Sequence, residues 1–278
     1  MTSASDVAVS TSELARIGLV DDAAIDLADA ALLLAAADQP GAPLDTARAR
    51  LTGLSLRLQR ESAGVTTALG RARVLSELIA HGNEMTGDTA DYENPRNADL
   101  LSLLDRKLGL PVTLAIVYVA LARRVGWMAD PIGLPGHVLV RVGVEPMTQL
   151  IDAFDGGRLL TPGGLAAVLE RVRGGPGAIE RDHLVPLSNR ATLVRLVSNQ
   201  ATRARRTGDV ARALVLHERM TLIAPGFTGL WWERARLEQL AGDLAAARAS
   251  LGAMLETTRD GDIRGRIRAA LKALARTS

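Results

Sequence analysis

His137 and Asp152 are the residues of this chain best suited to acid–base chemistry. His137 begins a segment, residues 137–142, in which β-branched residues alternate as in a strand, and Asp152 lies in a second short strand-like segment, residues 150–154. If residues 143–146 form the connecting loop, the pairing of the two strands places His137 directly opposite Asp152. At that separation a carboxylate can hold an imidazole N–H, so the pattern predicts a His–Asp pair.

The residue that such a pair would activate is missing. In a thiol enzyme the histidine takes a proton from a cysteine at a helix N-terminus, where the helix dipole favours the thiolate. This chain has no cysteine, and the helix that we expect after Gly109 begins with Pro111, whose missing N–H costs nothing at a first helical position. Thr113 lies two residues on, turned about 200° away from position 111, and is a poor substitute. Tyr118, two helical turns along on the same face, is predicted to be a hydrogen-bonding neighbour.

The predicted pair has two interpretations. It is either a structural pair, in which a carboxylate satisfies a half-buried histidine, or a working dyad in which His137 activates water or a substrate hydroxyl. A metal site is not predicted, because the four histidines share no ligand spacing, and no cofactor is expected. Residues 155–157, Asp-Gly-Gly, are interpreted as a turn. The four histidines are His81, His137, His183 and His217.

The elements around the pair are predicted to be mostly helical. Apolar periodicity and breakers predict three helices before a long polar loop at 81–97 and two helices after it, the first capped by Asn97 and ended by Gly109. The predicted helices span residues 22–37, 45–60, 66–80, 98–107 and 111–125.

The C-terminal third contains an internal repeat. Gly208-Asp209 recurs 34 residues later as Gly242-Asp243, a period typical of tetratricopeptide helix pairs, and a final amphipathic helix at 262–276 is expected to cap the array. Residues 174–177, Gly-Gly-Pro-Gly, read as a linker. The predicted division is a loose tail at 1–20, an α+β domain at 21–173, a linker at 174–186 and helical repeats at 187–278.

Composition limits the partners and the compartment. The chain has 278 residues, 47% of them apolar, and a formal net charge of +2, too small to imply a nucleic-acid partner. The basic residues of the last helix lack interleaved aromatics and are interpreted as a solvated face. Residues 1–12 do not read as a secretory signal, and no apolar run reaches the ~20 residues of a membrane span. We therefore predict a cytoplasmic protein without a membrane partner; its oligomeric state is left open.

Several motifs give the chain a family resemblance. Residues 106–111 read Arg-Lys-Leu-Gly-Leu-Pro, residues 133–137 Gly-Leu-Pro-Gly-His and residues 152–157 Asp-Ala-Phe-Asp-Gly-Gly, and Asp91-Tyr92 precedes Pro-Arg-Asn at 95–97. Together they resemble the bacterial SirB-type family, in which a transglutaminase-like domain precedes a tetratricopeptide tail. The resemblance implies an α+β core related to papain-like proteases, with His137 and Asp152 matching the catalytic residues. It also implies that Pro111 replaces the nucleophile, as is characteristic of this branch. Ala153 departs from the family pattern, where proline is expected.

These observations predict a predominantly helical α+β protein without thiol chemistry. We expect a cytoplasmic adaptor or regulator that binds a protein or peptide, with a hydrolase or transferase using the His137–Asp152 dyad as the alternative and a purely structural remnant as a third interpretation. Trp232, if exposed beside Arg234, is a candidate anchor for a bound peptide. The candidate binding residues are Tyr118, Arg141, Trp232 and Arg234.

Overall fold

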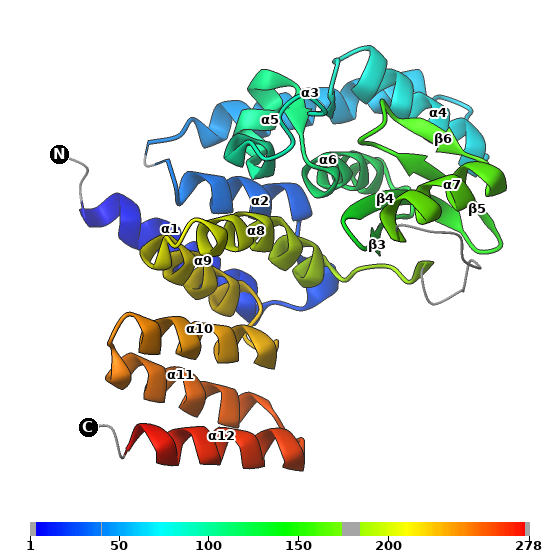
Figure 1. The fold of residues 1–278 in the computed structure, drawn as a ribbon. Coiled ribbons are helices and arrows are strands. Elements are labelled where there is room, and N and C mark those ends of the chain that lie inside the picture. Colours follow the sequence, from blue (N-terminus) through cyan, green and yellow to red (C-terminus); the bar gives the residue numbers. More distant parts are fainter. Residues whose placement is uncertain (1–3, 40, 174–183, 276–278) are drawn as a thin grey trace. The chain divides into compact units, whose positions relative to one another are not determined.

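The computed structural model describes residues 4–39, 41–173 and 184–275, which form two compact units. Unit 1 comprises Met1–Val7 and Asp21–Leu193, and unit 2 comprises Ala8–Val20 and Val194–Ser278. Helices dominate both units and a small sheet lies in unit 1, which confirms the predicted α+β class (Figure 1).

Unit 1 is built around helix α6, Pro111–Arg124, whose residues are buried from Pro111 through Ala122. Pro111 stands at the first helical position, as predicted. Shorter elements surround α6, and side chains cap several of them, including Asp26 on α2 and Thr67 on α4. These elements are η1 (Asp22–Ala24), α2 (Leu27–Ala36), α3 (Leu44–Glu61), α4 (Ala68–Ser76), η2 (Glu77–His81), η3 (Pro95–Ala98), α5 (Leu100–Arg106) and α7 (Pro162–Arg173).

The helix before α6 begins and ends differently from the prediction. Asp99, not Asn97, caps α5 by accepting a hydrogen bond from the amide of Ser102 at 2.7 Å. Lys107, with φ of 68°, ends the helix in the left-handed conformation before Gly109 is reached. Asn97 is instead buried, where its side chain and carbonyl bind the loop and the start of α6.

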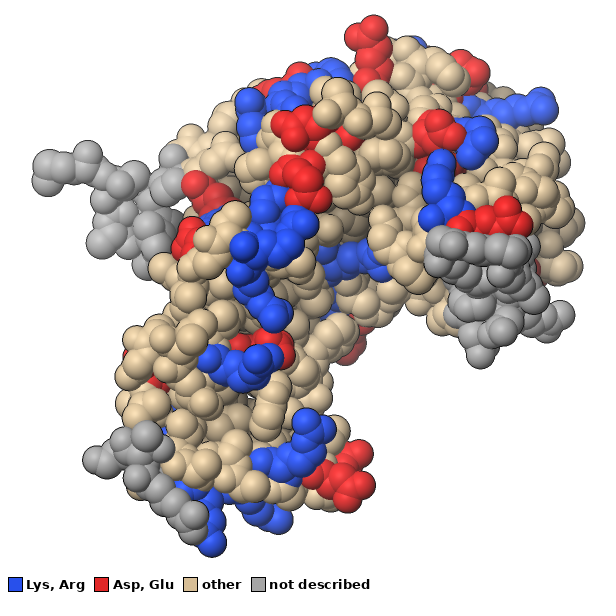
Figure 2. Space-filling view, viewed as in Figure 1, with Lys and Arg blue, Asp and Glu red and all other residues tan. Residues whose placement is uncertain are grey.

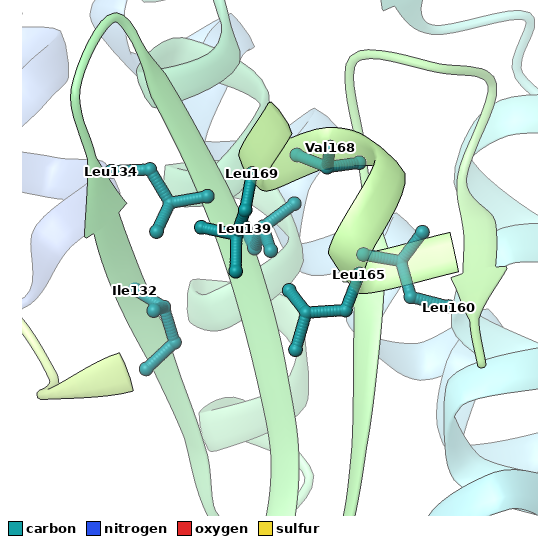
Figure 3. Packing of buried hydrophobic residues seen from close by; sticks show 7 residues of the cluster. All are labelled: Ile132, Leu134, Leu139, Leu160, Leu165, Val168 and Leu169. Atoms are coloured by element: carbon teal, nitrogen blue, oxygen red, sulfur yellow. The ribbon is translucent and has the colours of Figure 1, made fainter. Parts of the chain in front are cut away.

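A four-stranded antiparallel sheet in the order β3-β4-β5-β6 carries the predicted pair. Leu139 and its neighbours on one face pack under α7, as Figure 3 shows. Helix α6 contacts β3 and β4, and the alternate residues Val138 and Val140 of β4 are buried on the opposite face from Leu139. The strands are β3 (Ala129–Leu134), β4 (His137–Val144), β5 (Met147–Asp152) and β6 (Arg158–Leu160), and β1 (Thr86–Gly87) pairs separately in parallel with β2 (Leu108–Gly109).

The predicted register of the β4–β5 hairpin is wrong by two residues. Val144 pairs with Met147 and Arg141 with Leu150, because the connection is the two-residue turn Glu145-Pro146 and not a four-residue loop. A shift of two keeps every side chain on its predicted face. His137 therefore still reaches Asp152, but diagonally and not from directly opposite.

Unit 2 repeats with the predicted period of 34 residues. Asp209 caps α9 and Asp243 caps α11, and the equivalent residues Ala213 and Ala247 are both fully buried. The helices are α8 (Asn189–Arg206), which crosses from unit 1 into unit 2 at Val194, α9 (Val210–Ile223), α10 (Thr228–Leu240), α11 (Leu244–Thr257) and α12 (Gly261–Leu274).

Removing the second repeat's cap gives a first testable result. Asp243 accepts a hydrogen bond from the amide of Ala246 at 2.9 Å, so Asp243→Ala is expected to lower the free energy of unfolding by about 1 kcal/mol. Urea unfolding measures the change. Glu256→Ala, at an exposed non-capping position near the end of the same helix, is the control and is expected to change little. Equal effects of the two substitutions would contradict the cap's role.

The expectation of a loose tail at 1–20 is wrong where the structure describes it. Helix α1 spans Ala4–Leu19, with Leu14 and Ile17 buried. Gly18 approaches α9 so closely that an added Cβ would lie 2.1 Å from the carbonyl oxygen of Leu222. The one-turn spacing of Leu14, Ile17 and Gly18 therefore gives unit 2 an additional packed helix.

The predicted linker lies mainly outside the described residues, which resume at Leu184 after a gap at 174–183. From there the chain lies along strand β3. Pro186 forms a bridge with Ile132, and the amide of Leu187 donates to the carbonyl of Pro131 at 2.8 Å. Residues 184–187 thus belong to unit 1, whose boundary lies inside α8 and not at residue 187.

Candidate functional site

His137 and Asp152 form a buried hydrogen-bonded pair. The His137 Nε2 atom lies 2.9 Å from Asp152 Oδ1, and the two side chains are 7% and 0% exposed. The pair joins the first residue of β4 to the last residue of β5, so the sheet fixes its geometry. The predicted contact is present in the structure.

The surroundings of Asp152 keep its carboxylate ionised. Burial alone raises the pKa of Asp152, but the hydrogen bond and charge of His137, the Asp155 amide and the Arg171 guanidinium together lower that pKa below its ordinary value. The Asp155 amide donates to Oδ1 at 3.2 Å, and Arg171 of α7 lies 3.6 Å from Oδ2. Asp152 thus has two hydrogen bonds on Oδ1 and an ion pair on Oδ2.

Two aromatic rings cover the pair. The ring of Phe154 stands edge-on to His137, with centroids 6.0 Å apart, and the ring of Tyr92 stands edge-on to Phe154 at 5.7 Å. The Tyr92 hydroxyl donates to the carbonyl of Gly136, next to His137, at 3.4 Å. Phe154 and Tyr92 were part of the family motifs, but the sequence did not indicate that they would shield the histidine.

Gly87 leaves space for the Phe154 ring beside the start of α6. A Cβ at Gly87 would lie 2.4 Å from the Phe154 ring, and the Gly87 amide donates to the Phe154 carbonyl at 3.0 Å. Gly87 pairs with Gly109, two residues before Pro111. The strand pair β1–β2 therefore connects the aromatic cover to the helix end where a thiol enzyme presents its nucleophile.

Among the described residues, the hydroxyls of Thr113 and Ser76 are not arranged as substitute nucleophiles. Pro111 itself is buried. Thr113 is fully buried and donates to the carbonyl of Asn97 at 2.7 Å, and Ser76 donates to the carbonyl of Gly157 at the same distance. Both hydroxyls are thus hydrogen-bonded to the backbone, and neither is placed to give its proton to His137.

Tyr118 is a buried residue and cannot contact a partner. Burial raises the pKa of its phenol, with the Ser76 hydroxyl opposing and the Asp152 charge adding to the shift, so it is protonated at neutral pH. Its hydroxyl occupies the space that a side chain at Gly157 would need, 2.6 Å from the position of the absent Cβ. Tyr118 thus packs against the turn after Asp152, and its buried hydroxyl makes no hydrogen bond to any described residue there, so the expected hydrogen-bonding role is not seen.

A buried ionic network holds the loop between η2 and α5. Asp88 is 4% exposed and lies 3.2 Å from the Arg106 guanidinium, which also donates to the Asn97 side chain at 2.9 Å. The Asp91 amide, opposed by burial and aided by Asn97 and Arg106, lowers the pKa of Asp88. This network accounts for part of the Asp-Tyr and Pro-Arg-Asn motif, because both segments lie in the loop that it holds.

Arg141 is bound within the sheet. Its guanidinium donates to Asp130 on β3 at 3.0 Å and to Glu145 at the hairpin turn at 3.2 Å, and its side chain is 17% exposed. Asp130 also pairs with Arg123 of α6. These contacts give Arg141 a structural role in the hairpin and leave little of it for a partner.

The two residues predicted to anchor a bound peptide, Trp232 and Arg234, both make contacts within unit 2. Arg234 lies over the Trp231 ring at 5.7 Å and donates to buried Glu238 at 2.8 Å and to Thr221 at 3.1 Å, so its charge is used within the repeat. Trp232 is partly buried against the core of the last three helices, with Arg266 of α12 over its ring at 5.5 Å. Trp232 is therefore not an isolated exposed ring.

The described part of the chain contains no group of three or more histidine, cysteine or acidic residues that could hold a metal ion. His183 lies outside the described residues. Within the same ranges, no helix combines the length and the apolar character needed to cross a bilayer.

Two family patterns match the chain. The pattern of the transglutaminase-like superfamily matches residues 45–198, and a tetratricopeptide-repeat pattern matches residues 201–272. The boundary between the two matches, at residues 198–201, lies close to the boundary between the two structural units, at Leu193 and Val194.

Curated relatives include bacterial proteins and mammalian ones, among them F-box only protein 21 of Homo sapiens, which is 34% identical over 83 residues, 27% of this chain and 13% of that protein. A UPF0162 protein of Xylella fastidiosa strain Temecula1 is 27% identical over 213 residues, 76% of each chain, and one of Pseudomonas aeruginosa is 31% identical over 131 residues, 47% of each chain. Among solved structures, menin is 14% identical with a TM-score of 0.44, covering 90% of this chain and 69% of menin, a likeness too weak to support a conclusion.

Proposed function

Because the chain belongs to the transglutaminase-like superfamily but lacks a cysteine, we propose that it is a non-catalytic member that binds a protein or peptide partner. In this proposal the His137–Asp152 pair is a structural remnant of a thiol site. The helical repeats of unit 2 provide the binding surface. In the same proposal the protein is a member of the SirB-type branch and acts as an adaptor or regulator in the cytoplasm.

The observation that carries the proposal is the combination of Pro111 with a covered His–Asp pair. A general base needs a nucleophile or a water within hydrogen-bond reach, and Phe154 stands against His137 on the covered side. Thr113 and Ser76 each use their hydroxyl proton for a backbone carbonyl. The pair retains its geometry while its chemical partner is absent from the sequence.

Helical repeats support the binding part of the proposal. Arrays of this kind form extended surfaces that commonly recognise peptides, because each repeat adds a similar row of side chains. Tetratricopeptide-like helices follow directly after the transglutaminase-like region. A binding role therefore requires no residue of the closed thiol site.

Affinity capture tests the proposal. The intact chain and His137→Ala, immobilised under conditions where circular dichroism shows both to be folded, are exposed to lysate of the source organism, and bound proteins are quantified by mass spectrometry. We expect the same partner to be enriched by both forms. A species that accumulates only on His137→Ala would be a trapped substrate and would contradict the non-catalytic assignment.

The alternative function is a hydrolase or transferase that uses His137, oriented by Asp152, to activate water or a substrate hydroxyl. One observation favours it, namely the 2.9 Å contact with an aspartate of lowered pKa, since this is how a catalytic histidine is oriented. It requires that His137→Ala abolish a measurable turnover while the fold remains intact.

Restoring the thiol alone is not expected to restore catalysis. In Pro111→Cys the helix N-terminus would favour a thiolate, but position 111 is buried. We expect no amide or ester hydrolysis above that of the parent, and alkylation by iodoacetamide no faster than that of an ordinary buried thiol. Rapid alkylation at pH 6 together with new hydrolysis would contradict this prediction, because it would show that the site is open and still assembled.

A further inference from the structure

The charges of the chain are divided unequally between its two units. Unit 2 contains sixteen lysines and arginines against nine aspartates and glutamates, a formal charge of +7, whereas unit 1 has seventeen against twenty-two, a charge of −5. The net charge of +2 for the whole chain conceals this difference. Figure 2 shows more blue than red over helices α8 to α12. The helical repeats are therefore a strongly basic unit.

Four of the nine acidic residues of unit 2 are used as helix caps or in a buried ion pair. Asp209, Asp243 and Asp260 each accept hydrogen bonds from backbone amides at the start of a helix. Glu238 is 5% exposed and pairs with Arg234 at 2.8 Å. These four carboxylates therefore contribute to the caps and the core of unit 2.

A contiguous basic row crosses three helices of the array. Arg205 of α8 and Arg236 of α10 share one acidic residue, Glu233, at 3.5 and 3.0 Å. The neighbour of Glu233 on α10, Trp232, is covered by Arg266 of α12. We name this row the α8–α10–α12 face and define it by Arg205, Trp232, Glu233, Arg236 and Arg266.

The side chains of this face remain accessible. Arg205 and Arg236 expose 49% and 60% of their side chains, and Arg266 is also exposed. Residues 232, 236 and 240 follow one another at one-turn spacing along α10, and the last of them, Leu240, is 71% exposed. The face thus offers three guanidinium groups, one carboxylate, an indole and an exposed leucine.

We infer that the α8–α10–α12 face binds an acidic peptide segment of a protein partner through its arginines, with apolar side chains of that segment on Trp232 and Leu240. The inference rests on the proposed function and names the chemistry of the partner. Guanidinium groups bind carboxylates in bidentate geometry, and an indole flanked by arginine is a common centre of peptide interfaces. A nucleic acid fits less well, because the face as defined contains a single indole, whereas single-stranded nucleic acids bind through several aromatic rings on which successive bases stack.

The test measures the affinity of the full chain for a fluorescein-labelled peptide of glutamates with one leucine and one phenylalanine, by fluorescence anisotropy. The face variant is R205E/R236E/R266E. The control variant is R259E/R268E/K272E, which changes the charge of unit 2 equally at exposed residues outside the face. We expect the face variant to bind at least about tenfold more weakly than the parent, and the control variant to lose no more than about threefold.

Three outcomes would overturn the inference. Equal losses in the two variants would show a general charge effect, and tighter binding of a single-stranded oligonucleotide than of the peptide would point to nucleic acid. No binding of the peptide by the parent would exclude an acidic segment. These outcomes leave the proposed function untouched, because affinity capture detects a protein partner whether or not it is acidic. The proposed function is contradicted only if capture recovers no partner, or if a substrate accumulates on His137→Ala alone.

Discussion

Replacing His137 by alanine is expected to lower the free energy of unfolding by about 3 kcal/mol, because it leaves a buried carboxylate without its main partner. Asp152 is fully buried, and its remaining neighbours are the Asp155 amide at 3.2 Å and Arg171 at 3.6 Å. Urea unfolding of the parent and the variant measures the difference. An effect of this size identifies the pair as part of the structure of the sheet.

The loss is expected to depend on pH with a definite sign. The pKa of Asp152 is lowered in the folded parent, so its ionisation contributes stability above the unfolded value near 3.8, and this contribution is lost as the pH falls through the folded pKa. Without His137, burial opposes ionisation. The difference in stability between parent and His137→Ala should therefore grow as the pH rises from about 3 to about 6. A difference independent of pH would show that the lost energy is packing alone.

A second histidine of the chain provides the control. His81 lies 3.3 Å from Glu77, but both side chains are mostly exposed, at 64% and 72%. His81→Ala is expected to change the free energy of unfolding by no more than about 0.5 kcal/mol, because water and salt screen exposed pairs. Similar losses for His81→Ala and His137→Ala would remove the distinction on which the structural interpretation depends.

Gly157→Ala is expected to destabilise the protein by about 2–4 kcal/mol, because it combines backbone strain with a steric clash. Gly157 has φ of 72°, and an added Cβ would lie 2.6 Å from the Tyr118 hydroxyl and 3.1 Å from Ser76. Both neighbours are buried, so the turn between β5 and β6 must shift. Thermal and urea unfolding measure the effect.

The preceding glycine separates the two causes. Gly156 has φ of 60° and no atom within 4 Å of its absent Cβ. Gly156→Ala therefore meets the backbone strain without the clash and is expected to cost about 1 kcal/mol. If the two substitutions were equally destabilising, the packing of Tyr118 against the turn would have no energetic importance.

Local chemistry was sufficient to predict much of this fold. Pro111 marks the start of α6, since proline suits the first helical position. The 34-residue spacing from Asp209 to Asp243 reflects two capped helices, in which Ala213 and Ala247 occupy equivalent buried positions. The pairing of His137 with Asp152 followed from strand alternation, which fixes the face on which a side chain lies. A register error of two residues left that face unchanged.

Features that depend on tertiary packing could not be predicted. The turn length between β4 and β5 decided the register, and nothing in the composition of Gly143-Val144-Glu145-Pro146 distinguished two loop residues from four. The role of helix α1 was missed because Leu14 and Ile17 are only a short apolar stripe, whose burial depends on α9 lying against Gly18. Trp232 and Arg266 are 34 residues apart, and only the stacking of repeats shows that they touch.

The distribution of charge between the two units could not be predicted from the sequence either. The sequence alone gave a net charge near zero and a basic last helix, which was interpreted as a solvated face. Only the division into two units showed that the positive charge belongs to the repeats and that several carboxylates serve as helix caps. The acidic-peptide inference depends on this three-dimensional assignment of Arg205, Arg236 and Arg266 to one face.

A double-mutant cycle between His137 and Asp152, with two readouts, tests the central claim most directly. His137→Ala, Asp152→Ala and the double variant are compared in free energy of unfolding and in affinity for the partner recovered by capture. We predict a coupling energy of about 1 kcal/mol or more in unfolding and partner affinities that agree within about twofold among the folded forms. A cycle with no coupling in stability, accompanied by loss of a turnover or of partner affinity in each single variant, would contradict a structural pair and indicate a working dyad.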